Sequence, residues 1–344
     1  MREAVPLAPF TTIGLGGPAR YFCEWASAED AAQAIEFARN RSLPLHILGG
    51  GSNVIFHDAG FPGLVARIAT RGVTFDPPTG DTMVVRVAAG ESWDGLVAAS
   101  VVRGLSGLEC LSGIPGTVGG APIQNVGAYG QETAETLLDV ACLDRERLQR
   151  VTFGREQCGF GYRMSRFKGA DRDRYIVLGV RLRLRRNTRP VLRYAELAAA
   201  VTRRGGIDAL EPQAAVALVR EVVLELRRGK SMVLDAADPN TRSVGSFFMN
   251  PVLTPEAFAA LERRWRPPSF PAEQGVKVPA AWLVEQAGFP KGYVTDGVGV
   301  STRHALALVN RGGTTAQLLD LAKQIERAVF EKFGVRLERE AVVV

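Results

Sequence analysis

The chain has 344 residues, of which 46% are hydrophobic and 23% are charged, and its formal net charge is +6 at pH 7. These proportions are those of an ordinary globular protein, and the length allows two or three domains with sizeable cores. No apolar run approaches the ~20 residues needed to cross a bilayer, and the N-terminal MREAVPLAPF lacks a signal-peptide pattern, so we expect a cytoplasmic protein.

The first half of the chain mixes helix and strand signals. A helix is expected after the N-cap Ser27, with Asp30 at its third position, and it runs to about residue 41. A second helix follows the N-cap Ser92 and is closed by Gly104. Strands are expected over residues 43–48, 64–68, 83–88, 139–144, 150–153 and 175–185.

The second half begins with an amphipathic helix over residues 211–228. Thr254 and Pro255 then provide an N-cap and a first-turn proline for the next helix. The remaining expectations are a proline-rich loop over 266–275, a helix over 278–287, one or two strands over 297–310, a long helix over 314–333 and a final strand in the tail VRLEREAVVV.

The stretch from Leu111 to Gly130 reads LSGIPGTVGGAPIQNVGAYG and contains six glycines and no charged side chain. Glycines allow the backbone to press against a large flat group and allow successive N–H groups to converge on an anion. An irregular surface loop is the alternative, but loops of this length are uncommon and usually functional. We therefore predict that this stretch cradles a bound cofactor.

A second glycine cluster ends the apolar run LPLHILGGGSNV at residues 43–54. A buried strand that runs into a glycine turn is how α/β proteins present backbone donors to a diphosphate. It is not a Walker phosphate loop, because no lysine follows the glycines. Two separate glycine cradles indicate a large cofactor, such as a flavin dinucleotide, held across two subdomains.

Metal and nucleic-acid binding have little support in the sequence. The four cysteines show no CxxC spacing and there are only three histidines, so we predict free thiols and no metal site. Arginines at 181, 183 and 185 alternate with leucines, which is typical of the solvated face of a strand, and the pairs at 203–204 and 227–228 are also expected to be solvated. Because no basic run is interleaved with aromatic residues, no nucleic-acid partner is expected.

Three polar residues stand in apolar or glycine-rich surroundings. Arg163, in FGYRMSRFK, offers a fork of donors that suits a carboxylate. Ser246, in VGSFFMNP, suits a buried proton donor, and Glu340 lies beside Glu338 in the tail. Taken singly, each is more readily an ordinary surface or turn residue.

The chain resembles, almost from end to end, the UDP-N-acetylenolpyruvoylglucosamine reductases (MurB) of peptidoglycan synthesis, in their longer form with a tyrosine loop. The resemblance rests on TTIGLGGPAR, LGGGSNV, GLECLSGIPGTVGGAPIQNVGAYGQE, FGYR, GSFFMNP, AAWLVEQAG and LERE. It implies an α+β fold class, with a two-subdomain FAD-binding fold of the PCMH or vanillyl-alcohol-oxidase type over residues 1–186. A linking strand, loop and helix over 187–228 would carry the tyrosine loop, and an α+β substrate domain over 229–344 would return its tail to the active site.

The implied activity is reduction of UDP-N-acetylglucosamine enolpyruvate to UDP-N-acetylmuramate, with non-covalent FAD as cofactor and NADPH as the hydride source. The family's catalytic residues fall on Arg163, Ser246 and Glu340. Its FAD-binding positions fall on Gly49, Gly50, Gly51, Ser52, Asn53, Gly113, Ile114, Pro115, Gly116, Thr117, Gly119, Gly120 and Gly127. Its substrate-binding positions fall on Tyr162, Tyr194, Lys230, Asn250 and Gln286.

One departure from the family pattern is Met249, where relatives often have lysine. The resemblance further implies a monomer that binds a UDP-sugar and neither nucleic acid nor membrane. Two alternatives stay open at this point. One is an FAD-dependent alcohol oxidase of the same fold, and the other is a non-catalytic nucleotide-binding protein, suggested only by the basic pI near 9.3.

Overall fold

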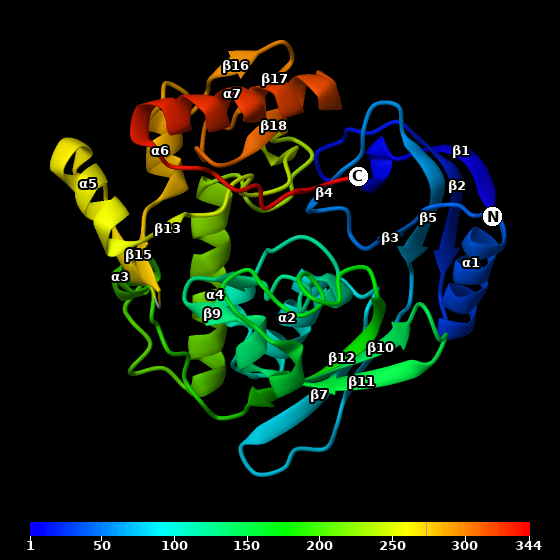
Figure 1. The fold of residues 1–344 in the computed structure, drawn as a ribbon. Helices are drawn as coiled ribbons and strands as arrows, with labels where there is room; N and C mark the ends of the chain where they lie inside the picture. The colour runs from blue at the N-terminus through cyan, green and yellow to red at the C-terminus, as the bar shows by residue number, and fades with distance from the viewer. Residues whose placement is uncertain (273) are drawn as a thin grey trace. The chain divides into compact units, whose positions relative to one another are not determined.

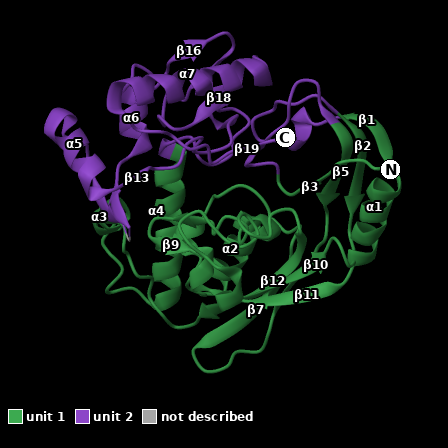
Figure 2. Cartoon of the chain, in the orientation of Figure 1, with its two compact units in different colours: residues 1–5, 19–50, 62–228 green, residues 6–18, 51–61, 229–344 purple. Residues whose placement is uncertain are grey.

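The structure is a computed structural model that describes residues 1–272 and 274–344 (Figure 1). The chain forms two compact units, which Figure 2 shows in different colours. No helix in these described ranges is long and apolar enough to cross a membrane. Unit 1 comprises Met1–Val5, Ala19–Gly50 and Pro62–Arg228. Unit 2 comprises Pro6–Pro18, Gly51–Phe61 and Gly229–Val344.

The first sheet of unit 1 is covered by helix α1 (Ala28–Asn40), as Figure 1 shows. The helix begins where the sequence predicts, because the Ser27 hydroxyl accepts from the Asp30 N–H at 3.0 Å and the Asp30 carboxylate accepts from the Ser27 N–H at 3.0 Å. Such reciprocal caps satisfy two backbone donors that the first turn leaves open. The strands of this sheet, in spatial order, are β1 (Arg2–Pro6), β2 (Pro18–Trp25), β5 (Phe61–Ile68) and β3 (Leu45–Leu48).

The second sheet of unit 1 has a buried valine row in register across its middle, Val140–Val180–Val87. Its outer face carries the alternating arginines, which are exposed while the intervening Leu182 and Leu184 are fully buried, as predicted. Helix α2 (Trp93–Val102) adds apolar side chains to the same core. The strands, in spatial order, are β11 (Arg150–Gly154), β10 (Leu137–Asp144), β12 (Tyr175–Arg185), β7 (Thr82–Ala88) and β6 (Val73–Phe75).

Two further helices of unit 1, α3 (Ala195–Arg203) and α4 (Pro212–Gly229), share a smaller apolar cluster. The buried face of α4 consists of valines and alanines at helical spacing, which confirms the predicted amphipathic helix. Cys110, at the start of the glycine-rich region, also packs into this cluster. A two-stranded ribbon of β8 (Gly127–Ala128) and β9 (Gln131–Glu132) lies at the end of that region.

Unit 2 is built around α7 (Thr315–Phe333), which has a Thr314–Gln317 capping box and ends at Gly334 with φ +68°. Thr254 caps α5 (Pro255–Trp265) as expected, and α6 (Ala280–Gln286) completes the helices of this unit. The small sheets are β13 (Val252–Leu253) with β15 (Gly275–Lys277) and β14 (Phe270–Ala272), β16 (Val294–Thr295) with β17 (Val298–Val300) and β18 (Leu308–Asn310), and β19 (Val342–Val343) with β4 (Val54–Ile55).

One expectation about unit 2 was wrong, and the final strand expected in the tail is present but short. The proline-rich region expected as a loop over 266–275 contains β14 and the start of β15, while residue 273 lies outside the described residues. Pro271 fits a strand because β14 is at the edge of its sheet, where a missing N–H is tolerated. The C-terminal tail forms only the short strand β19, which pairs in parallel with β4.

Candidate active site

The two glycine segments predicted to form a cradle come together within unit 1. A Cβ atom placed on Gly50 would lie 2.6 Å from the Gly116 Cα atom, and one on Gly49 would lie 2.8 Å from the Thr117 hydroxyl oxygen. The close approach therefore requires glycine at both positions. The Thr117 hydroxyl oxygen is buried and has no hydrogen-bond partner among the described residues, so a polar group of a ligand would satisfy it. These features fit a phosphate-bearing cofactor.

The other glycines of the Leu111–Gly130 stretch differ in what a side chain at their position would meet. Gly113 and Gly116 have φ values of +72° and +117°, which side chains rarely adopt. Gly119 is held by packing, since a Cβ there would lie 2.7 Å from the Ala89 Cβ. Nothing lies within 4 Å of a Cβ on Gly120. The cradle is thus open at Gly120, where a flat ligand has room to pack.

We expect Gly120→Val to lose FAD while the apoprotein keeps its stability, because the new side chain occupies space that only the ligand would fill. Gly119→Ala is the matched contrast, since its methyl group meets Ala89, and overpacking of this kind costs about 1–3 kcal/mol. The measurements are flavin absorbance per mole of protein and denaturant unfolding of the apoproteins. Full flavin occupancy in Gly120→Val would mean that the cradle is misplaced.

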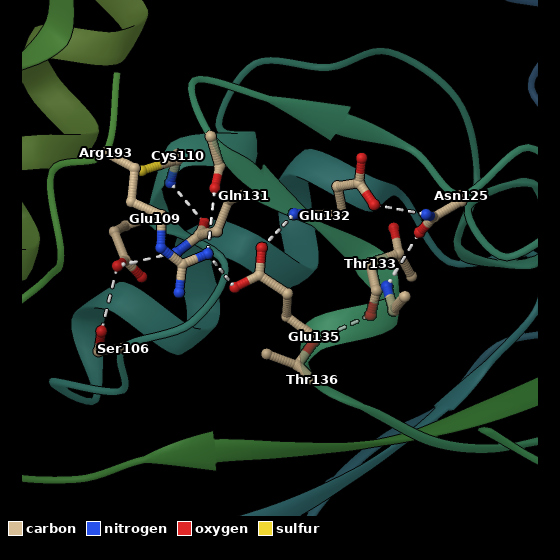
Figure 3. A network of polar contacts seen from close by, with 12 residues as sticks. Ser106, Glu109, Cys110, Asn125, Gln131, Glu132, Thr133, Glu135, Thr136 and Arg193 are labelled. Atoms are coloured by element: carbon tan, nitrogen blue, oxygen red, sulfur yellow. Dashed lines mark hydrogen bonds and ion pairs between the residues drawn. The ribbon is translucent and has the colours of Figure 1, made fainter. Parts of the chain in front are cut away.

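A buried polar network ties the two ends of the glycine-rich stretch together (Figure 3). The Glu109 carboxylate, only 1% exposed, accepts from the Ser106 hydroxyl at 3.1 Å and from the Gly107 and Leu108 N–H groups at 2.6 and 3.0 Å. Gln131 donates to Glu109 at 3.1 Å and accepts from the Cys110 N–H at 2.9 Å. Four donors thus satisfy one buried carboxylate. The network connects the residues just before the glycine-rich stretch to the residue just after it.

A second polar group holds the Gly113 end of the cradle. The Asp94 carboxylate accepts from the Gly113 N–H at 2.6 Å and from the Arg220 guanidinium at 2.6 and 3.0 Å. Burial acts to raise the pKa of Asp94, but the hydrogen bonds from Arg220 and Gly113 outweigh it, so the pKa is lowered. Asp94 therefore stays ionised and keeps the Gly113 backbone in place.

Arg227 is the residue on which the sequence prediction fails. It was expected to be solvated, yet it is half-buried, its Nε atom is withdrawn from solvent and it donates to the Gly113 carbonyl at 3.4 Å. Burial lowers its pKa, nearby Tyr129 and Asp94 oppose this, and the Arg163 charge adds to it. The available signal was the seven-residue spacing between Arg220 and Arg227, which places both on one face of α4.

Unit 1 also contains the predicted site residues Tyr162, Arg163 and Tyr194, which differ in their surroundings. Arg163 is half-buried and has a left-handed φ of +53°, and Tyr162 beside it is 45% exposed. Tyr194, 46% exposed, precedes α3 and makes an edge contact with Tyr129 at 5.5 Å between ring centroids. Burial raises the pKa of Tyr129 to about 12, so this partner ring carries a neutral hydroxyl.

Unit 2 brings two of the predicted catalytic residues together. The Glu340 N–H donates to the Phe247 carbonyl at 2.9 Å, and the Met249 N–H donates to the Glu338 carbonyl at 2.9 Å. The tail therefore runs alongside the segment that begins at Ser246. Buried Phe247 and Phe248 anchor that segment in the core.

Other predicted residues of unit 2 have different surroundings. The Asn53 amide donates to the Glu340 carbonyl at 3.2 Å, which joins the GGGSN turn to the tail. The side-chain amide oxygen Oδ1 of Asn250 accepts from the Ala280 N–H at 2.9 Å, which fixes the start of α6. Lys230 is half-buried just beyond α4, and Gln286 is exposed at the end of α6.

Comparisons with known proteins agree with this arrangement. The family model of the FAD binding domain matches residues 19–146, and that of the UDP-N-acetylenolpyruvoylglucosamine reductase C-terminal domain matches residues 238–344. The chain is 47% identical to the UDP-N-acetylenolpyruvoylglucosamine reductase of Thermobifida fusca, covering 99% of this chain and 97% of that protein. It is 46% identical to the enzyme of that name in Streptomyces coelicolor, covering 98% and 89%.

Among solved structures, the crystal structure of the Thermus caldophilus MurB aligns with a TM-score of 0.68 and 28% identity, covering 98% of this chain and 97% of that one. An FAD-binding domain followed by a reductase-specific C-terminal domain defines a flavin-dependent oxidoreductase of mixed α and β structure. The chain belongs to the UDP-N-acetylenolpyruvoylglucosamine reductase family. It is an NADPH-dependent flavoenzyme of peptidoglycan precursor synthesis.

Proposed function

We propose that Arg163, Ser246 and Glu340 carry the reduction of the enolpyruvyl group of UDP-N-acetylglucosamine enolpyruvate. The observation that supports this most directly is the backbone pairing that sets Glu340 against the residue after Ser246. A proton donor and a carboxyl group held by one rigid pairing suit a reaction that needs a proton at one carbon and charge stabilisation at its neighbour.

The substrate is a polarised alkene attached to a carboxylate. When bound, FAD would supply the hydride, drawn from NADPH, that reduction of the terminal alkene carbon requires and that no side chain can provide. Charge then develops on the adjacent carbon and its carboxylate. The Arg163 guanidinium, and Glu340 as the protonated acid, would stabilise that enol-like state, and a single such donor contributes about 3–4 kcal/mol. Ser246 would deliver the proton that completes the lactyl ether.

The remaining residues are proposed to hold the cofactor and the UDP-sugar. The cradle would take FAD without a covalent bond through Gly49–Asn53 and Gly113–Gly127. Lys230 suits a phosphate as a point charge. Exposed Tyr162 and Tyr194 would contact the substrate together with Asn250 and Gln286. We further propose a cytoplasmic monomer that does not bind nucleic acid.

One experiment tests this function. The purified yellow protein is expected to bleach with NADPH under anaerobic conditions and to regain its colour when UDP-N-acetylglucosamine enolpyruvate is added. UDP-N-acetylglucosamine is the matched control, because it has the same nucleotide end and no alkene. Recolouring by O₂ and not by the enolpyruvyl compound would favour an oxidase, and a colourless protein that takes up no FAD would favour a non-catalytic binder.

A further inference from the structure

Arg163 lies in a tight turn, and residues outside the turn stabilise its backbone conformation. The turn is closed by reciprocal hydrogen bonds between Gly161 and Met164, with N–H to carbonyl distances of 3.1 and 3.2 Å. Inside it, Arg163 has a left-handed backbone with φ +53°, a conformation that a non-glycine residue keeps only where its surroundings impose it. Tyr162 beside it is 45% exposed.

The first support is Asn125, which lies in the glycine-rich stretch and is only 1% exposed. Its amide nitrogen donates to the Gly161 carbonyl at 3.2 Å and to the Glu132 carboxylate at 2.6 Å (Figure 3 shows the latter). Its amide oxygen accepts from the Ala134 N–H at 3.0 Å. A flipped amide would set oxygen against two acceptors, so the network fixes the side chain in the orientation that holds Gly161.

The second support is Ser165, also 1% exposed, on the other side of the turn. Its hydroxyl donates to the Ile123 carbonyl at 2.5 Å and accepts from the Phe167 N–H at 3.2 Å. A third bond runs from the Lys168 ammonium to the carbonyl of Arg163 itself, at 3.1 Å. The turn is therefore attached on both sides to residues 123 and 125 of the glycine-rich stretch.

We propose that Asn125 and Ser165 are positioning residues of the reaction, which hold the Arg163 turn in register with the cradle that binds FAD. This inference rests on the proposed role of Arg163. Two buried side chains, each hydrogen-bonded as donor and as acceptor, hold the backbone of the turn from which the guanidinium extends. Neither side chain needs to touch the substrate for the reaction to depend on it.

The test uses the FAD-loaded enzyme and two separate rates, reduction by NADPH and reoxidation of the pre-reduced enzyme by saturating enolpyruvyl substrate. Ser165→Ala is expected to slow reoxidation by about 10–10²-fold, since a misplacement of about 1 Å in a catalytic group costs that much, and to leave reduction unchanged. Thr133→Val is the matched control. Thr133 is equally buried, and its hydroxyl bonds the Val126 carbonyl of the same stretch at 2.9 Å, so its loss should alter neither rate.

A double-mutant cycle separates positioning from general damage. In the Arg163→Ala background, Ser165→Ala is expected to cause no further slowing, because it acts only through the arginine. Further slowing of equal size there would overturn the proposal. If Ser165→Ala does not fold, Asn125→Gly takes its place, because glycine accepts the φ of +45° at this position and removes the side chain that carries the amide.

The outcomes also distinguish this inference from the proposed function. Unchanged reoxidation in Arg163→Ala alone would remove the arginine's assigned role and the positioning proposal with it. Slow reoxidation in Arg163→Ala, combined with normal rates in both Ser165→Ala and Asn125→Gly, would reject the positioning proposal and leave the role of Arg163 intact.

Discussion

Replacing Ser246 with alanine is expected to slow reoxidation of the reduced enzyme by the enolpyruvyl substrate by ~10²–10⁴-fold, the usual cost of losing a placed proton donor. Reduction by NADPH should continue unchanged, because it involves no carbon of the substrate. The hydroxyl is small, and the buried rings of Phe247 and Phe248 anchor the segment without it. Stopped-flow flavin absorbance, run separately for each half of the reaction, measures both rates.

A cysteine at this position tests whether the lost function is proton donation. A thiol is also a proton donor, so Ser246→Cys should recover part of the reoxidation rate that Ser246→Ala loses. Equal slowing of both half-reactions in Ser246→Ala would indicate a change in structure or in flavin binding. Either that result or slowing of neither half would mean that Ser246 is not the proton donor.

The parts of the fold that the sequence predicted well are those with local signals. Ser27 and Asp30 three residues apart define a helix start by themselves, and the alternation of Arg181 with leucines defines a half-exposed strand. The two glycine segments were also recognisable, because clustered glycines can be read directly from the sequence. Their contact at Gly50 and Gly116 agrees with the predicted cradle.

The contacts that shape the site depend on residues far apart in the chain. Asp94 holds Gly113 and Arg220, and Asn125 reaches Gly161, but neither pairing follows from a periodic pattern. No periodic pattern predicts, either, that Pro6–Pro18 and Gly51–Phe61 belong to unit 2 together with the C-terminal residues. A bond such as that from the Thr12 hydroxyl to the Ser243 carbonyl, 2.6 Å long, is made only once the chain has folded.

Arg227 illustrates a second limit. A pair of arginines at the end of a helix is usually solvated, and composition alone supports that interpretation. The burial of Arg227 follows from the position of the Gly113 loop over α4, which the sequence does not encode locally. A charged residue at a site is therefore harder to predict than a glycine, because its function depends on what surrounds it.

Substitution of Glu340 is expected to have the second large effect on the reoxidation rate, after substitution of Ser246. Glu340→Ala is expected to slow reoxidation by the enolpyruvyl substrate by ~10²–10³-fold, the cost of removing one donor, here the O–H of the protonated carboxylic acid, that stabilises developing negative charge. The backbone around it should survive, since the bonds to Phe247 and from Asn53 use the main-chain atoms of Glu340 and not its side chain. Flavin content and the rate of reduction by NADPH are therefore expected to stay unchanged.

Two further variants define what the carboxyl group contributes. Glu340→Gln replaces the acid O–H with an amide N–H donor at the same place, so its rate should fall between those of the wild type and Glu340→Ala. Glu338→Ala is the matched control, because Glu338 is exposed in the same tail and only its carbonyl is used, by the Met249 N–H. If Glu338→Ala slowed reoxidation as much as Glu340→Ala does, the effect would belong to the tail as a whole and Glu340 would lose its assigned role.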